Sequence, residues 1–479
     1  MQLTFIGLIQ LVIGAVIFFG GSLRHAVTFM IISGLFAGSA AIVLPALGGS
    51  SIPPIQFACL IVYLRILAPR GGFLALLPDA VRANRWLVLY TFYGVASAVI
   101  APRLFANQID VTPLRFDAAR TLFDTVPLVP STQNITTSVY LLGTLAVAVA
   151  AYLMARLRGG VATLISTAIL VSWLHIVLGL ATALAAGTPL NAVFELMRNG
   201  NYAQLDQAVG GFVRIRGFFP ESSSYADFAF AYFTLNAELW YRSIRPRATG
   251  VTALALAMLL VISTSSTAYL ALAAYMGFFA LRVIVMPHLA QSLRVKQLVV
   301  ATLVGLLLMA VALLAVPQFL ASASDMILHM TVNKSGSDSA QQRLFWAMQG
   351  LDAFKTSYGL GIGPGSFRSS SLVTAMIGST GLVGCGAFLA YAYSVFQPTR
   401  HSSFGVSPDL ALTIGGAFAT AAMLALIPAC LISPSADLGA NVALFAGVAV
   451  ALRPVVPSRK ADDPGPALSP PVPAQAMKG

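Results

Sequence analysis

Charged residues are scarce in this sequence of 479 residues: Asp, Glu, Lys and Arg make up 9% of it, whereas hydrophobic residues make up 58%. Soluble domains carry about 25% charged residues, so the composition excludes a water-soluble fold. A membrane-spanning helix needs about 20 apolar residues with few charges, and such stretches recur along nearly the whole chain. The sequence therefore predicts an all-α, polytopic integral membrane helix bundle with no large soluble domain.

Cysteine and histidine are also few, with three and five copies. Cys59, Cys385 and Cys430 lie in separate apolar runs without CxxC spacing, which argues against a disulfide framework or a zinc site. The histidines show no HxxxH or HExxH spacing, and no DxD pair occurs, so we predict neither a metal nor a cofactor. His329, in an outer loop, is a weak candidate for a base and is otherwise a packed loop residue.

Basic residues outnumber acidic ones, which gives a formal net charge of +12. In a soluble protein this excess would suggest a nucleic-acid partner. Here most Lys and Arg residues fall in short loops between apolar stretches, where they act as topology signals. We therefore predict membrane lipids, and no nucleic acid, as partners.

The apolar stretches predict about 12 or 13 transmembrane helices. The region between Arg247 and Arg282 is too long for one span and has basic residues at both ends, so it is divided into two helices with an outer turn near Ser263. The helices are predicted near residues 3–20, 26–47, 52–69, 86–102, 136–156, 161–187, 222–241, 248–264, 266–286, 297–317, 370–396, 408–432 and 437–453.

Lys and Arg are more frequent in the loops that follow odd-numbered helices, which places those loops in the cytoplasm. The opposite, periplasmic side then holds three long outer loops, near 103–135, 188–221 and 318–369. Long loops among short connections are where function is expected. Residues 1–453 are thus predicted to form a single bundle, and the Pro/Ala-rich segment 454–479 a disordered cytoplasmic tail.

The first motif joins the second long loop to the next helix. Arg214 and Arg216 come just before a predicted helix start, where Pro220 suits the first turn. Two arginines at a helix N-terminus match a phosphate or pyrophosphate group. Glu221 is a candidate to orient an arginine or to act as a general base, and Ser222 is a candidate contact. The alternative is an interfacial snorkelling pair with a helix cap.

Tyr225 and Asp227 follow in the same helix and extend this candidate substrate site. Asp227 lies one to two turns into an apolar stretch. A carboxylate is costly in lipid, so Asp227 is expected to face a partner or a water-filled cavity. It is either a functional residue or a simple partner of a buried Arg or Tyr.

The second motif lies in the third long loop and has helical spacing. Leu344, Met348 and Leu351 share one face, whereas Arg343 and Trp346 lie on another. This pattern predicts an amphipathic helix on the membrane surface, with its apolar face on the bundle or the lipid. Arg343 is either a second phosphate-binding, leaving-group-stabilising cation or a solvated loop arginine, and Trp346 is a candidate substrate contact.

The third motif, Gly359–Gly365, has glycine at every second position. No preceding strand or following Walker lysine accompanies it, so a nucleotide-binding loop is excluded. It predicts a tight turn whose backbone approaches another segment closely and which has a structural role. Arg368 follows at another outer helix start and is a candidate addition to the same anion pocket.

Together these motifs resemble the O-antigen ligase and polymerase superfamily of bacterial surface-polysaccharide enzymes. The resemblance covers roughly residues 135–395 and rests on the Arg-x-Arg-Gly-Phe-x-x-Glu-Ser-Ser-x-Tyr-Ala stretch, the Arg343 helix and the glycine turn. It implies a GT-C-like bundle in the inner membrane that transfers sugar at the periplasmic face without metal or nucleotide. Arg216, Arg343 and Glu221 would be catalytic.

The resemblance also implies polyprenyl-pyrophosphate-linked glycans as substrates and a chain-length regulator as a candidate protein partner. Ligases of the superfamily usually place a His shortly after the glycine turn, and residues 369–376 contain none. This departure favours a polymerase, with an O-antigen ligase acting on a lipid A core or a protein as the alternative.

Two other classes remain open. A transporter or flippase predicts paired polar residues near the middle of the membrane and two related halves, and apart from Asp227 and His175 the helices offer little of that. A structural scaffold for an assembly complex would need none of these arginines.

Overall fold

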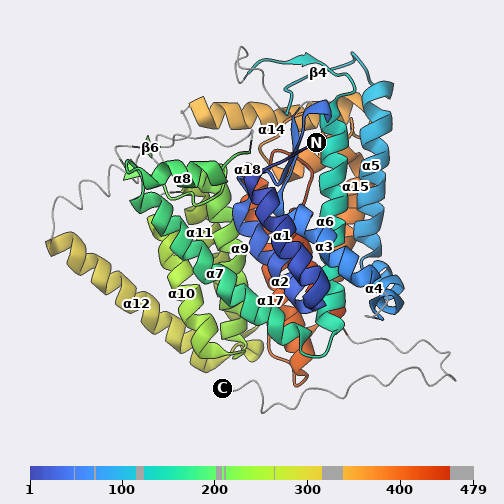
Figure 1. The fold of residues 1–479 in the computed structure, drawn as a ribbon. Coiled ribbons are helices and arrows are strands. Elements are labelled where there is room, and N and C mark those ends of the chain that lie inside the picture. Colours follow the sequence, from blue (N-terminus) through green and yellow to red (C-terminus); the bar gives the residue numbers. More distant parts are fainter. Residues whose placement is uncertain are drawn as a thin grey trace.

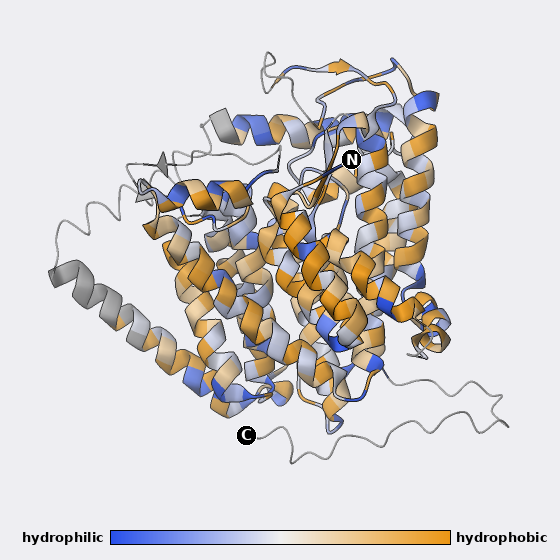
Figure 2. Cartoon of the chain, in the orientation of Figure 1, coloured by the Kyte–Doolittle hydropathy of each residue, from blue (hydrophilic) through white to orange (hydrophobic). Residues whose placement is uncertain are grey.

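The computed structural model describes residues 1–47, 49–68, 72–114, 123–200, 208–209, 212–263, 265–315 and 338–453, and it is almost entirely helical (Figure 1). The predicted tail at 454–479 and the first part of the third long loop, with His329, lie outside the described residues. Figure 2 shows apolar residues along most of the length of the helices and hydrophilic residues concentrated toward the two ends of the bundle.

The first half of the chain forms most of the bundle core. Its helices are α1 (Phe5–Gly20), α2 (Leu23–Ser33), α3 (Pro54–Leu67), α4 (Leu77–Ala83), α5 (Arg85–Leu104), α6 (Thr132–Arg156), α7 (Gly160–Leu184), α8 (Leu190–Met197), α9 (Ser222–Tyr241) and α10 (Pro246–Ile262). Four short 3-10 turns are η1 (Gly34–Phe36), η2 (Pro45–Leu47), η3 (Phe73–Leu76) and η4 (Pro287–Leu289).

The second half adds α11 (Ser266–Val285), α12 (Ser292–Ala315), α14 (Asp338–Thr356), α15 (Leu372–Phe396), α16 (His401–Phe404), α17 (Leu410–Leu424), α18 (Leu426–Ile432) and α19 (Ala440–Ala451). Short antiparallel strands join loops: β1 (Gln2–Leu3), β2 (Ile42–Leu44) and β3 (Ser50–Ile52) in one sheet, β4 (Asp110–Val111) with β5 (Val126–Pro127), and β6 (Ala208–Val209) with β7 (Phe212–Val213).

Six helical stretches of the described residues are long and apolar enough to cross a membrane: α5, α6, α7, α11, α15 and the run from α17 through α18. Shorter apolar helices, α1, α2 with η1, α3, α10 and α19, accompany them. Large apolar side chains such as Leu8, Val16 and Leu254 are exposed on the outside of the bundle, as lipid contact requires. The helical membrane class is therefore confirmed, and the number of spans stays a prediction.

The predicted helix at 26–47 is wrong in its second half. The chain leaves helical geometry after η1 and forms β2 instead. A Cβ on Gly38 would lie 2.8 Å from the carbonyl oxygen of Phe218, so the chain passes close to another segment here. Hydropathy cannot distinguish an apolar helix from apolar irregular backbone that hydrogen-bonds within the protein.

The two ends of the bundle differ in what they carry. The end that we call the loop end holds α8, α14 and the β4–β5 hairpin (Figure 1). The opposite end, which we call the basic end, holds the start of α5 and the ends of α6, α15 and α19. The Arg156 guanidinium at the end of α6 donates to the Ala451 carbonyl at the end of α19, at 3.4 Å, which ties two of these helix ends together.

The glycine turn is buried beside α15. Gly359, Gly361, Gly363 and Gly365 have φ of 83°, 83°, 92° and 86°, which only glycine adopts freely. The Gly363 amide donates to the Ser379 carbonyl at 3.0 Å, so the turn hydrogen-bonds to the helix. The predicted tight turn of close approach is confirmed.

Gly381 kinks α15 opposite this turn. Its φ of 56° and ψ of −156° interrupt the helix. The Leu382 amide then donates to the Gly359 carbonyl at 2.8 Å, which satisfies polar groups on both segments. The kink and the turn thus form one unit.

A buried ionic cluster ties α9 to its neighbours near the basic end. Arg242 Nη1 lies 2.9 Å from Glu238 Oε2, and Arg282 Nη1 lies 3.0 and 2.9 Å from the two oxygens of Glu238. All three side chains are at most 1% exposed. Arg282 also lies 4.2 Å from the centre of the Tyr241 ring.

Arg242 directly follows α9, and Arg282 lies in the last turn of α11. Both are buried inside the protein, because the Glu238 carboxylate provides the counter-charge. A local sequence window shows a basic residue at a helix end. It does not show that a residue from a distant helix packs there.

Replacing Gly381 by Ala should destabilise the protein by about 2 kcal/mol or more, because its φ is positive and the new Cβ would lie 2.1 Å from the Gly359 carbonyl oxygen. Gly386→Ala, in the same helix but with open space around it, is the matched control and should be neutral. Thermal unfolding of the purified protein in detergent measures both. Equal melting temperatures for the two variants would contradict a strained kink.

Replacing Glu238 by Gln should cost about 3–5 kcal/mol, because two buried arginines lose their counter-charge. Asp79→Asn is the control: Asp79 pairs with Arg82 at 3.3 Å with both side chains exposed, so its loss should cost under about 1 kcal/mol. Thermal unfolding separates the two expectations. A Glu238→Gln protein as stable as Asp79→Asn would rule out a stabilising role for the ionic cluster.

Candidate functional site

Three segments pack together next to the first motif: the chain around Phe36 and Gly38, the chain at Gly200, and the chain at Phe218. The Gly38 amide donates to the Phe218 carbonyl at 2.7 Å, and the Gly200 amide donates to the Gly38 carbonyl at 3.0 Å. The Phe36 and Phe218 rings stack with their centres 5.2 Å apart. The chain from Arg214 to the start of α9 is therefore held in a fixed path.

Arg216 lies in an ionic cluster within this packing. Its Nη2 lies 3.0 Å from Glu195 Oε1, and Arg198 pairs with the same carboxylate. Arg198 Nη1 also donates to the Gly217 carbonyl at 3.0 Å. Glu195 and Arg198 thus position the Arg216 segment, and the catalytic role of Arg216 stays a prediction.

Glu195 and Arg198 did not emerge as site residues from the sequence. Glu195 lies in the last turn of α8 and Arg198 is its C-cap, so their spacing of three residues brings two opposite charges together, and that was the available signal. The pairing of Glu195 with Arg216 had no local signal, because the two residues come from separate segments.

Glu221 is the N-cap of α9, and its side chain accepts a hydrogen bond from Ser223 Oγ. Ser222 begins the helix and is buried. Pro220 lies before the cap rather than in the first helical turn, which corrects its predicted position. The helix start itself, at residue 222, is confirmed.

Three arginines contribute to the electrostatic environment near this cap. Burial lowers the pKa of the Arg214 guanidinium below its ordinary value, the Glu221 carboxylate partly offsets that effect, and the positive charge of Arg343 lowers the pKa further. Burial likewise lowers the pKa of Arg368, and Glu221 again opposes the change. Arg214, Arg343 and Arg368 are therefore close enough to share one electrostatic environment with Glu221.

Helix α14 brings Arg343 to this place. Arg368 lies with its guanidinium carbon 4.5 Å from the centre of the Trp346 ring, and Ser370 Oγ donates to the Arg343 carbonyl at 2.5 Å. Gln349 exchanges two hydrogen bonds of 2.8 Å with Thr112 of the first long loop. The helix is thus fixed across the loop end from both sides.

The predicted amphipathic helix at residues 343–350 is confirmed, and its orientation is now defined. Trp346 is 8% exposed, whereas Leu344 and Met348 are 65% and 44% exposed. Gly350 allows the close approach, because a Cβ there would lie 2.2 Å from the Thr374 carbonyl oxygen of α15. The aromatic face packs on the bundle, and the aliphatic face points away from it.

Tyr225 is buried against α7. Its ring stacks on His175 with the ring centres 3.9 Å apart, and its hydroxyl donates to the His175 carbonyl at 3.0 Å. A side chain on Gly179 would collide with this hydroxyl. The contacts of Tyr225 serve helix packing, and its predicted substrate contact stays a prediction.

Asp227 lies on the accessible side of α9. From Ser222 to Leu239 every residue of the helix is buried except Ser224 and Asp227, which are half-buried and, like the half-buried Glu221, follow a spacing of three. Within the described part of the chain Asp227 has neither a hydrogen bond nor an ion pair. Its side chain is half-buried and lies on the side of the helix that begins at Glu221.

No family model, no curated protein and no solved structure matches this chain. Among the described residues no group of three His, Cys, Asp or Glu side chains could hold a metal ion. The candidate reactive side chains at the loop end are Arg214, Arg343, Arg368, Glu221 and Asp227.

Replacing Glu195 by Gln should release the Arg216 segment, because both Arg198 and Arg216 lose their shared carboxylate. Amide hydrogen exchange of residues 214–221 should then become faster in the purified protein. Asp352→Asn, which removes an exposed pair with Lys355 at 3.7 Å, is the control and should leave that exchange unchanged. Identical exchange rates in the two variants would show that Glu195 does not hold the segment.

Proposed function

We propose that the protein is a glycosyltransferase of the polysaccharide-polymerase type that uses polyprenyl-pyrophosphate-linked glycans at its loop end. The single observation that carries the proposal is that α14 and the segment before α15 contact each other at Arg343 and Arg368, in the same electrostatic neighbourhood as Arg214 and Glu221. The three arginines come from the segment before α9, from α14 and from the segment before α15, so this concentration of positive charge is a product of the fold.

The arginines suit the leaving group of such a reaction. When the bond between the sugar and the pyrophosphate breaks, negative charge develops on the phosphate oxygens, and guanidinium groups stabilise it through charge-assisted hydrogen bonds. Arg214 and Arg368 are largely buried, which strengthens this interaction relative to water. We therefore assign Arg214, Arg343 and Arg368 to the pyrophosphate.

The acceptor hydroxyl needs a base on the other side of the reacting carbon. Asp227 is better suited than Glu221, because Glu221 accepts a hydrogen bond from Ser223 and interacts electrostatically with two arginines, whereas Asp227 has neither a hydrogen bond nor an ion pair among the described residues. The transfer forms the new glycosidic bond as the bond to pyrophosphate breaks, and the acceptor proton passes to Asp227. Glu221 then serves to orient the arginines.

Location and partners follow from the same proposal. The loop end faces the periplasm of a bacterial inner membrane, where lipid-linked repeat units are the substrates, and a chain-length regulator is a candidate protein partner. The GT-C-like description of the bundle belongs to this proposal as well. An O-antigen ligase would use the same arginines with a different acceptor.

Purified protein mixed with lipid-linked repeat units alone should produce a ladder of polymer lengths. Arg214→Ala, Arg343→Ala and Arg368→Ala should each reduce the rate by about a hundredfold or more, because a cation on the leaving group is lost. Arg103→Ala, which removes an exposed arginine at the loop end, is the matched control and should retain the activity.

In the same assay, Asp227→Asn should lower kcat with little change in KM, because the base acts only in the transition state. A product that appears only when a lipid A core or a protein acceptor is added would identify a ligase. Full activity in all three arginine variants would exclude the arginine site.

A further inference from the structure

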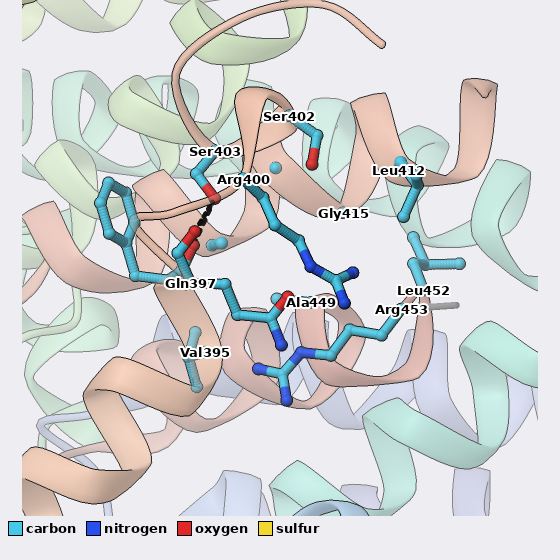
Figure 3. Close-up of a pocket in the computed structure, with 13 residues that line it drawn as sticks. Val395, Gln397, Arg400, Ser402, Ser403, Leu412, Gly415, Ala449, Leu452 and Arg453 are labelled. Atoms are coloured by element: carbon cyan, nitrogen blue, oxygen red, sulfur yellow. Dashed lines mark hydrogen bonds between the residues drawn. The ribbon is translucent and has the colours of Figure 1, made fainter. Parts of the chain in front are cut away.

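A small recess lies at the basic end, far from the proposed sugar chemistry (Figure 3). It is bordered by Gln397, Arg400, Gly415, Leu452 and Arg453, among others. Figure 3 shows the Gln397, Arg400 and Arg453 side chains reaching into it.

The backbone around the recess is well defined by hydrogen bonds. Gln397 ends α15 with a left-handed φ of 48°, and its amide donates to the Tyr393 carbonyl at 2.9 Å. The Gln397 carbonyl accepts from the Arg400 amide at 3.0 Å and from Ser403 Oγ at 2.8 Å. This turn places the Arg400 side chain opposite Arg453, which follows α19.

The two guanidinium groups have no acidic partner in the described part of the chain. Arg453 Nη2 is buried and has no hydrogen-bond acceptor there. Burial lowers the pKa of Arg453 to about 10, and the positive charge of Arg400 contributes to the decrease. Arg453 remains charged at neutral pH, and neither guanidinium group has an acidic partner among the described residues.

The neighbouring carboxylates are engaged elsewhere. Asp409 caps α17 by accepting a hydrogen bond of 2.8 Å from the Ala411 amide. Glu238 is committed to Arg242 and Arg282. A buried arginine nitrogen without an acceptor is costly, which indicates that an anion from outside the described chain completes the site.

We propose that the recess formed by Gln397, Arg400 and Arg453 binds a phosphate-bearing anion. Two guanidinium groups and an amide provide the donors that phosphate oxygens accept. The recess lies where α15, which is long and apolar enough to cross a membrane, and the shorter α19 both end. Lipid headgroups are expected near the ends of spanning helices. The ligand is a phosphate group, from an anionic lipid headgroup or from free phosphate. This site is independent of the proposed function.

The test uses the full chain purified in a neutral detergent and measures its melting temperature with three additions. The additions are dioleoyl phosphatidylglycerol, dioleoyl phosphatidylcholine, and sodium phosphate against sodium chloride of equal ionic strength. Stabilisation by phosphatidylglycerol but not phosphatidylcholine identifies a lipid headgroup, whereas stabilisation by sodium phosphate in neutral detergent identifies the free ion. No stabilisation by either phosphate source would overturn the proposal.

In the double variant Arg400→Gln with Arg453→Gln, the concentration of the stabilising phosphate source that gives half of the maximal increase in melting temperature should rise by about tenfold or more. Arg247→Gln, an exposed arginine at the start of α10, is the matched control and should respond like the wild type. An equal loss in the control, or an unchanged effect in the double variant, would overturn the proposal. Arg400→Gln alone gives the same comparison if the double variant does not fold.

The segment that follows Arg453 contains Asp462 and Asp463, whose carboxylates are a competing source of anion. A chain ending at residue 456 therefore completes the experiment. If the recess takes an external phosphate, the shortened protein keeps the wild-type response. If the response appears only after shortening, the chain itself occupies the recess, and the proposal is wrong.

Discussion

The placement of α9 depends on one interaction, the fully buried ion pairs of the Glu238 carboxylate with Arg242 and Arg282. In a low-dielectric interior a charge must be paired, so α9 and α11 meet at this point. Almost all of α9 is then enclosed by other helices. With one end of the helix fixed there, its other end brings Glu221 and Asp227 to the loop end in a defined orientation.

A second constraint acts on the backbone. Inside a bilayer every amide and carbonyl must find a partner within the protein, and this chain contains apolar segments that are not helical. The glycine turn satisfies its backbone against α15, and the segment around Gly38 satisfies its backbone against Phe218 and Gly200. These contacts fix the backbone next to Arg368, which follows the glycine turn, and next to Arg214, which precedes Phe218. The positions of both arginines therefore depend on backbone packing.

Much of the fold could be predicted from local patterns. Hydropathy located most helices to within a few residues, and the start of α9 and the amphipathic character of α14 followed from residue spacing. The errors have one cause. The second half of the helix predicted at 26–47 and the missed Glu195 both depend on contacts with residues far away in the chain, which no local window contains.

The sequence by itself determined that this is a membrane protein, because its composition is too apolar for a water-soluble fold. It also identified the arginines at the loop end. Only the tertiary structure decided how those arginines are used. It placed Arg214 with Arg343 and Arg368, paired Arg216 with Glu195, and brought Arg400 to Arg453. Each relationship joins separate segments, and the packing of helices around α9 sets the distances between them.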